Sequence, residues 1–220
     1  RFICIDKSTY STSPYKKKSV IIYNIFNSQN LKKIISKNKK HLFYVGFLGS
    51  LDFHKGLDFY FECISEINKS KNNFIFLIGG SLSVTNKFLS TILDLFNIKK
   101  NFTKVFINFK RKKYHNVKFL NNVTNLDKFY NNIDVICFPS RMNALGRPII
   151  EAASHAVPSV VCLKEYFKDT IINNKTGYVL KFGDKKNFIK KLEYLNKDTK
   201  KLNELGLNAK KNYHSKHNVI

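Results

Sequence analysis

The chain has 220 residues, of which 43% are apolar, and its formal net charge is +24. This length suits one compact domain with additional segments, and the apolar content excludes a mainly disordered protein. No run approaches the roughly 18 consecutive apolar residues of a membrane-spanning helix, so we expect a soluble or peripheral protein. Because the chain begins at Arg1 without a leader-like segment and ends abruptly, we expect a piece of a longer polypeptide.

The basic excess is mostly lysine, dispersed along the chain among many Asn, Ile and Phe residues. Nucleic-acid sites gather basic residues on one face, so this distribution argues against a nucleic-acid partner and favours an anionic membrane surface. Cys4, Cys63, Cys137 and Cys162 lack the paired spacing of a zinc or redox site. We expect buried, reduced thiols and a cytoplasmic location, peripheral on the inner face of the membrane.

The first residues contain two short β-like runs, Phe2 to Ile5 and Ser19 to Asn24, separated by Ser, Thr, Pro and Lys. From His41 onward, strands and helices alternate. "HLFYVGFLG" is a continuous apolar run, which is typical of a strand buried on both faces. "KGLDFYFECISEINKS" has helical spacing, with one apolar side formed by Leu57, Phe61, Ile64 and Ile67.

The alternation continues to the end of the chain. We expect further strands at Asn73–Ile78, Val105–Phe109, Val117–Leu120, Ile133–Phe138, Ser159–Leu163 and Tyr178–Leu180. We expect helices at Asn86–Asn97, Asn125–Tyr130, Arg147–His155, Tyr166–Asn173, Lys185–Asn196 and Thr199–Tyr213. This order predicts an α/β fold with a Rossmann-like, doubly wound parallel sheet.

Such sheets bind ligands at the carboxyl ends of their strands, where helix N-termini carry positive partial charge. Three features fall at that edge: the loop after "FYVGFLG", the Gly79-Gly80 turn, and the stretch "SRMNALGRPIIEA". In the last of these, a helix is expected to begin between Gly146 and Pro148, because proline suits the first helical turn.

The N–H groups at this helix start, with Arg141 and Arg147 nearby, suit a diphosphate. Glu151 lies one turn further along, where a carboxylate can accept the hydroxyls of a ribose. In the simpler alternative, Gly146 begins an ordinary helix cap and Glu151 is an acid favoured by the helix dipole.

Four segments, in order, resemble family 4 glycosyltransferases. "PSRMNALGRPIIEAASHAVPSVV" is similar to the donor-site signature of that family, and "FYVGFLGSLDFHKGLDFYFECI" resembles its Gly-Arg-Leu and Lys-Gly element. "FIFLIGG", followed by "VKFLNNVTNLDKFYNNIDVICFPS", resembles the intervening strands and the loop beside the nucleobase. "KTGYVL" resembles a late Thr-Gly strand. The resemblance covers Ser19 to about Asp184.

The resemblance implies the C-terminal half of a GT-B glycosyltransferase. Residues 1–18 would be a remnant of the N-terminal acceptor domain and linker, residues 19–200 the Rossmann-like donor-binding domain, and residues 201–220 a C-terminal helix and tail. The implied co-substrate is a nucleoside-diphosphate sugar containing UDP or GDP, and no cofactor is implied. The absence of an Asp-x-Asp motif agrees with metal-independent transfer, in which cationic side chains and helix N–H groups neutralise the leaving diphosphate.

The resemblance assigns catalytic roles to three residues: Lys55 contacts the donor diphosphate, Asn143 the transferred sugar, and Glu151 the ribose. The full implied donor-binding set is Gly49, Ser50, Lys55, Gly80, Arg141, Asn143, Ala144, Leu145, Gly146, Arg147 and Glu151. Base contacts are expected from backbone in the loop near Asn121 to Thr124.

The sequence departs from the family at three places. Asn143 replaces a glutamate and therefore has no negative charge to stabilise an oxocarbenium ion. Ser50 replaces an arginine, so one phosphate cation is absent, and Arg141 or Arg147 would compensate. His155-Ala156-Val157 replaces the usual glycine before proline, and we expect His155 to be a helix-end residue. A loop histidine such as His54, beside Lys55, is most often exposed, and the alternative is that it reaches the cleft between the two domains of the GT-B fold.

We therefore expect a retaining transferase that moves a sugar from a nucleoside diphosphate to a cell-surface glycan or lipid-linked acceptor. Three alternatives remain open at this point. One is another GT-B enzyme, such as a nucleotide-sugar epimerase, and a second is a non-catalytic nucleotide-sugar-binding domain. A nucleic-acid-binding protein would instead show steep salt dependence and no preference among nucleotides.

Overall fold

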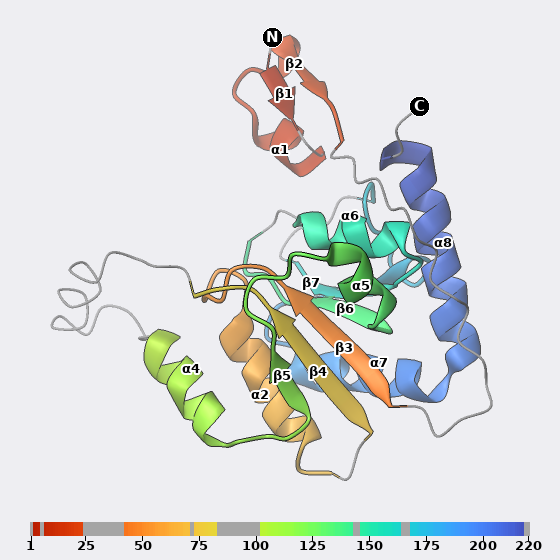
Figure 1. Cartoon of the computed structure of the whole chain (residues 1–220). Coiled ribbons are helices and arrows are strands. Elements are labelled where there is room, and N and C mark those ends of the chain that lie inside the picture. Colours follow the sequence, from red (N-terminus) through yellow and green to blue (C-terminus); the bar gives the residue numbers. More distant parts are fainter. Residues whose placement is uncertain are drawn as a thin grey trace, which may run out of the picture.

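The computed structural model describes residues 2–4, 7–23, 42–70, 73–82, 102–142, 146–163 and 168–217. Its centre is a six-stranded, wholly parallel sheet with the strand order β5-β4-β3-β6-β7-β8 (Figure 1). The strands are β3 (Phe43–Leu48), β4 (Phe74–Gly79), β5 (Val117–Phe119), β6 (Val135–Phe138), β7 (Ser159–Cys162) and β8 (Gly177–Leu180). The order runs outward in both directions from β3, which confirms the predicted doubly wound sheet.

Two apolar cores lie on opposite faces of this sheet. Along β3, Phe43, Val45 and Phe47 belong to one core, whereas Tyr44 and Leu48 pack against the other. Successive side chains of a strand point to opposite faces, so a central strand needs apolar residues at every position. The continuous apolar run in the sequence follows from this double burial.

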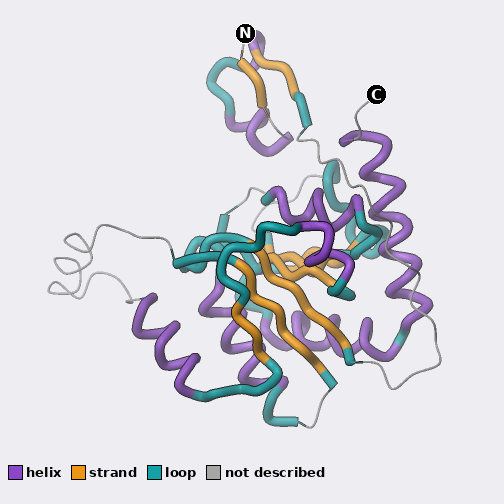
Figure 2. Tube along the Cα trace, viewed as in Figure 1, coloured by secondary structure: helices purple, strands orange, loops and turns teal. Residues whose placement is uncertain are grey.

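Helices cover both faces of the sheet (Figure 2). The first core includes residues of α2 (Leu57–Ile67), α4 (Phe102–Arg111) and α7 (Lys185–Lys197). The second core includes residues of α5 (Leu126–Asn131) and α6 (Arg147–Ser154). The long helix α8 (Thr199–His217) packs against α6, α7 and β8.

The first residues form a small layer of their own, separate from the layers built around the six-stranded sheet (Figure 1). It contains β1 (Phe2–Cys4), α1 (Lys7–Thr12), a 3-10 helix (Lys16–Lys18) and β2 (Ser19–Ile21), and β1 pairs with β2 in parallel. The backbone N–H of Lys7 donates to Asp169 Oδ2 at 3.0 Å, which ties this layer to the larger one. The domain boundaries after residues 18 and 200 stay predictions.

Two predicted elements are wrong where the structure describes them. Residues Val105–Phe109 lie in α4, not in a strand, and their apolar side pairs with α2 through stacked Phe61 and Phe109 rings whose centroids are 4.0 Å apart. Residues 168–173 form a turn and a bridge instead of the end of a helix. The helix predicted at Asn86–Asn97 lies outside the described residues.

All four cysteines are buried and none is in a disulfide, which confirms the prediction of buried thiols. Within the described ranges, no helix combines the length and the apolar character needed to cross a membrane.

Candidate functional site

The carboxyl ends of β3, β4 and β6 lie side by side at one edge of the sheet. Gly49 and Gly80 directly follow β3 and β4, and the Gly49 N–H donates to the Gly79 carbonyl at 3.1 Å. The Gly80 N–H donates to the carbonyl of Asn121 at 2.7 Å. The structure therefore brings the predicted base-side loop to the same edge as both glycines, and it places Ser50 there, half-buried.

The loop that carries Lys55 is bonded to the turn after β6. The Ser140 hydroxyl and the Arg141 N–H both donate to the carbonyl oxygen of His54, at 3.3 and 3.0 Å. Asp52 Oδ1 accepts the backbone N–H of Lys55 at 2.9 Å and closes the loop. Two motifs that are more than eighty residues apart in the sequence are thus in direct contact.

Lys55 and the start of α6 meet at one aromatic ring. The Lys55 ammonium lies over the ring of Phe138, 5.3 Å from its centroid. The backbone of Gly146 packs against the same ring so closely that a Cβ at this position would lie 2.7 Å from Phe138 Cζ. Gly146 is the N-cap of α6, and Pro148 lies in its first turn, which confirms the predicted helix start.

The structure pairs Arg141 with an acidic residue. Its guanidinium makes two bonds of 2.6 Å to the carboxylate of Asp58 in α2, and it stacks over the ring of Phe182 at 4.4 Å. Such a bidentate ion pair is strong and fixes the plane of the guanidinium. Asp58 therefore balances the charge of Arg141, whereas Arg147 is largely exposed and contacts Glu151 at 3.4 Å.

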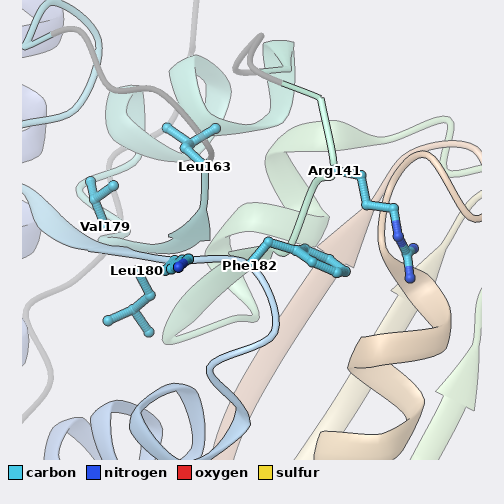
Figure 3. A pocket seen from close by; sticks show the side chains of 6 residues that line it. Arg141, Leu163, Val179, Leu180 and Phe182 are labelled. Carbon is cyan, nitrogen blue, oxygen red and sulfur yellow. The ribbon is translucent and has the colours of Figure 1, made fainter.

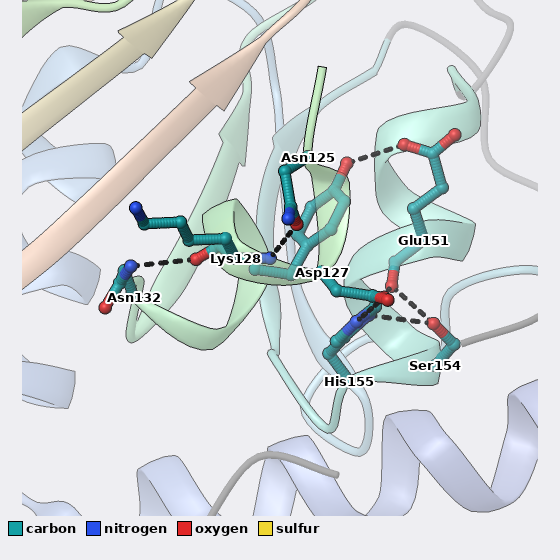
Figure 4. Close-up of polar contacts among 8 residues, drawn as sticks. Asn125, Asp127, Lys128, Asn132, Glu151, Ser154 and His155 are labelled. Atoms are coloured by element: carbon teal, nitrogen blue, oxygen red, sulfur yellow. Dashed lines mark hydrogen bonds and ion pairs between the residues drawn. The ribbon is translucent and has the colours of Figure 1, made fainter. Parts of the chain in front are cut away.

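Glu151 is buried between α5 and α6, with only 5% of the residue exposed. The Tyr130 hydroxyl donates to Glu151 Oε2 at 2.7 Å, while Oε1 faces Arg147 (Figure 4 shows the carboxylate). Burial, together with the neighbouring Glu151 carboxylate, raises the pKa of Tyr130 far above its usual range, so this hydroxyl keeps its proton and acts as a donor.

His155 ends α6, as expected, but it is fully buried. Its Nε2 lies 2.7 Å from Asp127 Oδ1, and its Nδ1 lies 2.9 Å from the backbone carbonyl of Glu151 (Figure 4). Sequence reasoning missed both Asp127 and Tyr130. Their spacing in the sequence was the available signal. Asp127 and Tyr130 are three residues apart, and Glu151 and His155 are four apart, so each pair lies on one side of its helix.

A cavity of about 590 Å³ opens at the carboxyl ends of β7 and β8 (Figure 3). Its lining consists of Arg141, Leu163, Val179, Leu180, Lys181 and Phe182. Of these residues, only Arg141 was predicted from the sequence to belong to the site. The predicted site residues Asn143, Ala144 and Leu145 lie outside the described residues.

Known proteins are similar to this chain in sequence and in fold. CapM of Staphylococcus aureus, a capsular polysaccharide biosynthesis glycosyltransferase, is 26% identical over 174 residues, which are 79% of this chain and 42% of CapM. The chain thus spans less than half the length of that relative. A TarM structure from S. aureus with UDP superposes with a TM-score of 0.73 at 20% identity, covering 98% of this chain and 40% of TarM.

Anabaena HepE, in a structure with UDP and glucose, superposes with a TM-score of 0.75 at 16% identity, covering 98% of this chain and 58% of HepE. At these identities, the superpositions show a shared fold: this chain has the Rossmann-like fold of one half of a GT-B glycosyltransferase. The model of the family described as "Glycosyl transferases group 1" matches residues 28–212. Because that match spans most of the sequence, the chain belongs to the group 1 glycosyl transferases.

Proposed function

We propose that this chain is the nucleotide-sugar-binding half of a glycosyltransferase that transfers a sugar to a cell-surface glycan or lipid-linked acceptor. The proposed transfer is retaining and metal-independent, and the proposed location is cytoplasmic and peripheral to the membrane. Family membership supports the transferase class, and the name of CapM supports a polysaccharide product. The UDP in the TarM and HepE structures supports a nucleotide donor.

One observation carries the proposal. Lys55 and the N-terminus of α6 converge on the ring of Phe138, and Glu151 lies one turn further along the same helix. A helix N-terminus and a lysine together favour a diphosphate. A carboxylate in the adjacent turn favours ribose hydroxyls. The order of these groups therefore supports a single nucleotide, with its diphosphate at Lys55 and the start of α6 and its ribose at Glu151.

In the proposed reaction, the diphosphate leaves as the glycosidic bond to it breaks. Lys55 and the start of α6 stabilise the charge that grows on its oxygens. Glu151 holds the ribose, and Asn143 orients the sugar. A second, N-terminal domain binds the acceptor, and an acceptor hydroxyl loses its proton and forms the new glycosidic bond to the sugar as the bond to the diphosphate breaks.

A thermal-shift panel on the complete polypeptide tests donor binding. The ligands are UDP, GDP, ADP and their sugar conjugates, and a ligand that binds the folded state raises the Tm with its concentration. We expect UDP or GDP to do so, and Glu151→Ala to reduce that shift. Glu62→Ala, at an exposed carboxylate of α2, is the matched control. Parent-like nucleotide affinity in Glu151→Ala would overturn the ribose assignment.

Turnover is a separate test. The complete polypeptide is given the best-binding nucleotide sugar and a glycan acceptor, and release of the nucleoside diphosphate is followed. Tight nucleotide binding without turnover on any acceptor would instead indicate a binding domain. Equal, salt-sensitive binding of every polyanion would point to nucleic acid.

A further inference from the structure

Helices α5 and α6 are joined by two polar contacts, a buried one from Tyr130 to Glu151 and a partly buried one from Asp127 to His155. The Tyr130 hydroxyl holds the Glu151 side chain through Oε2 at 2.7 Å. His155, anchored by Asp127 at 2.7 Å, faces the Glu151 backbone carbonyl through Nδ1 at 2.9 Å. The rings of Tyr130 and His155 pack together with centroids 5.3 Å apart. The Glu151 carboxylate is thus held directly from α5, and its backbone carbonyl faces His155, the C-cap residue of its own helix, which Asp127 of α5 holds.

This arrangement fixes the orientation of the carboxylate. A buried carboxylate needs donors, because it has lost most of its water. Tyr130 is itself fully buried and cannot change rotamer freely, so it dictates where Oε2 lies. Oε1 is then turned toward Arg147, whose contact of 3.4 Å is longer than an ordinary hydrogen bond.

We propose that Tyr130 is a positioning residue that aims Glu151 at the ribose hydroxyls and thereby makes the chain select ribonucleotides over nucleotides without these hydroxyls. The inference rests on the proposed function, because it assumes that Glu151 faces a ribose. His155 and Asp127 assist by holding the backbone of the same residue.

A purely structural role for Tyr130 makes a different prediction. Tyr130 is also part of the apolar core between the sheet and α5. If packing were its only contribution, loss of its hydroxyl would leave the preference between nucleotides unchanged. It would then either have no effect on binding or weaken the binding of all nucleotides by the same factor. A ratio of two affinities therefore separates the roles, whereas a single affinity does not.

The test compares UDP with 2′,3′-dideoxy-UDP by calorimetry on the complete polypeptide. We expect the parent to bind UDP about tenfold more tightly than 2′,3′-dideoxy-UDP, or better. Hydrogen bonds from the ribose hydroxyls to a charged carboxylate account for a difference of this size. Tyr130→Phe should lower this preference several-fold through weaker UDP binding, with unchanged dideoxy-UDP binding. Tyr60→Phe, at an equally buried tyrosine of the other core, should keep the parent ratio.

Asp127→Asn is a second, milder variant, because Asp127 is partly exposed. It should lower the same ratio by a smaller factor, and it tests the assisting role of Asp127 and His155 independently of Tyr130. A parent ratio retained in the folded variants overturns the role of Tyr130 and leaves the proposed function intact. A parent that binds neither nucleotide overturns both proposals.

Discussion

The carbonyl oxygen of Pro139 lies where a Cβ on Gly56 would have to be placed. Gly56 also has a left-handed backbone, with φ of 68°, at the point where the Lys55 loop enters α2. The close approach holds the Lys55 loop against the turn after β6. Glycine is therefore required here for two reasons, the contact and the backbone conformation.

Gly56→Ala should lower the free energy of unfolding by about 3 kcal/mol, because the left-handed conformation and the steric overlap both add cost. Gly183→Ala is the control, since Gly183 also has a positive φ, of 91°, but has open space around it. We expect that control to lose only about 1 kcal/mol. Urea unfolding of both variants checks the difference, and equal losses would contradict the role of Pro139.

Ala156 has a φ of 56°, in the position after α6 where glycine is usual. Its N–H donates to the carbonyl of Ala153, and the next N–H donates to that of Ala152, which completes a Schellman motif. Ala156→Gly should therefore raise the free energy of unfolding by about 1 kcal/mol. Ala153→Gly, inside α6, should lower it by a similar amount or more. Urea unfolding measures the change in the free energy of unfolding for both variants. Destabilisation by Ala156→Gly would contradict this prediction.

Most of the sheet could be predicted from the sequence, because strands buried on both faces leave continuous apolar runs. Residues 105–109 show where that reasoning fails. This segment is rich in Phe and β-branched residues, which favoured a strand. In the structure, apolar residues recur at helical spacing and pack on Phe61 and Phe119, so tertiary packing decides in favour of helix.

The candidate site shows the same division. The motif positions of Lys55, Gly146 and Glu151 could be read from the chain, because each belongs to a local pattern. The pairing of Arg141 with Asp58 and of Glu151 with Tyr130 could not. Those contacts depend on the spatial order of strands and helices, which brings together residues far apart in sequence.

Lys55→Gln should weaken UDP binding by about tenfold, because the charge-assisted contact to the diphosphate is lost. Binding of uridine, which has no phosphate, should not change. The exposed Lys69, which pairs with Glu66 at 2.8 Å, provides the control Lys69→Gln. Calorimetry with UDP and with uridine measures the change in each affinity. Equal weakening of UDP and uridine would place Lys55 away from the diphosphate.

Alkaline pH should destabilise the fold through its buried thiols. Burial, with a smaller contribution from Asp184, raises the pKa of Cys162 from 9.0 to about 12. The folded protein keeps this proton where the unfolded chain releases it. The stabilisation is therefore complete below about pH 9 and is lost as pH rises from there toward about 12, with a slope of about 1.4 kcal/mol per pH unit for one thiol.

Cys162→Ala isolates this contribution from lysines that titrate in the same range. The substitution removes one buried group, so it lowers the free energy of unfolding at every pH through lost packing. It should also make the decline above pH 9 shallower than in the parent. Urea unfolding at several pH values from about 8 upward measures both effects. Parallel curves for the two proteins would mean that the Cys162 thiol titrates alike in the folded and unfolded states.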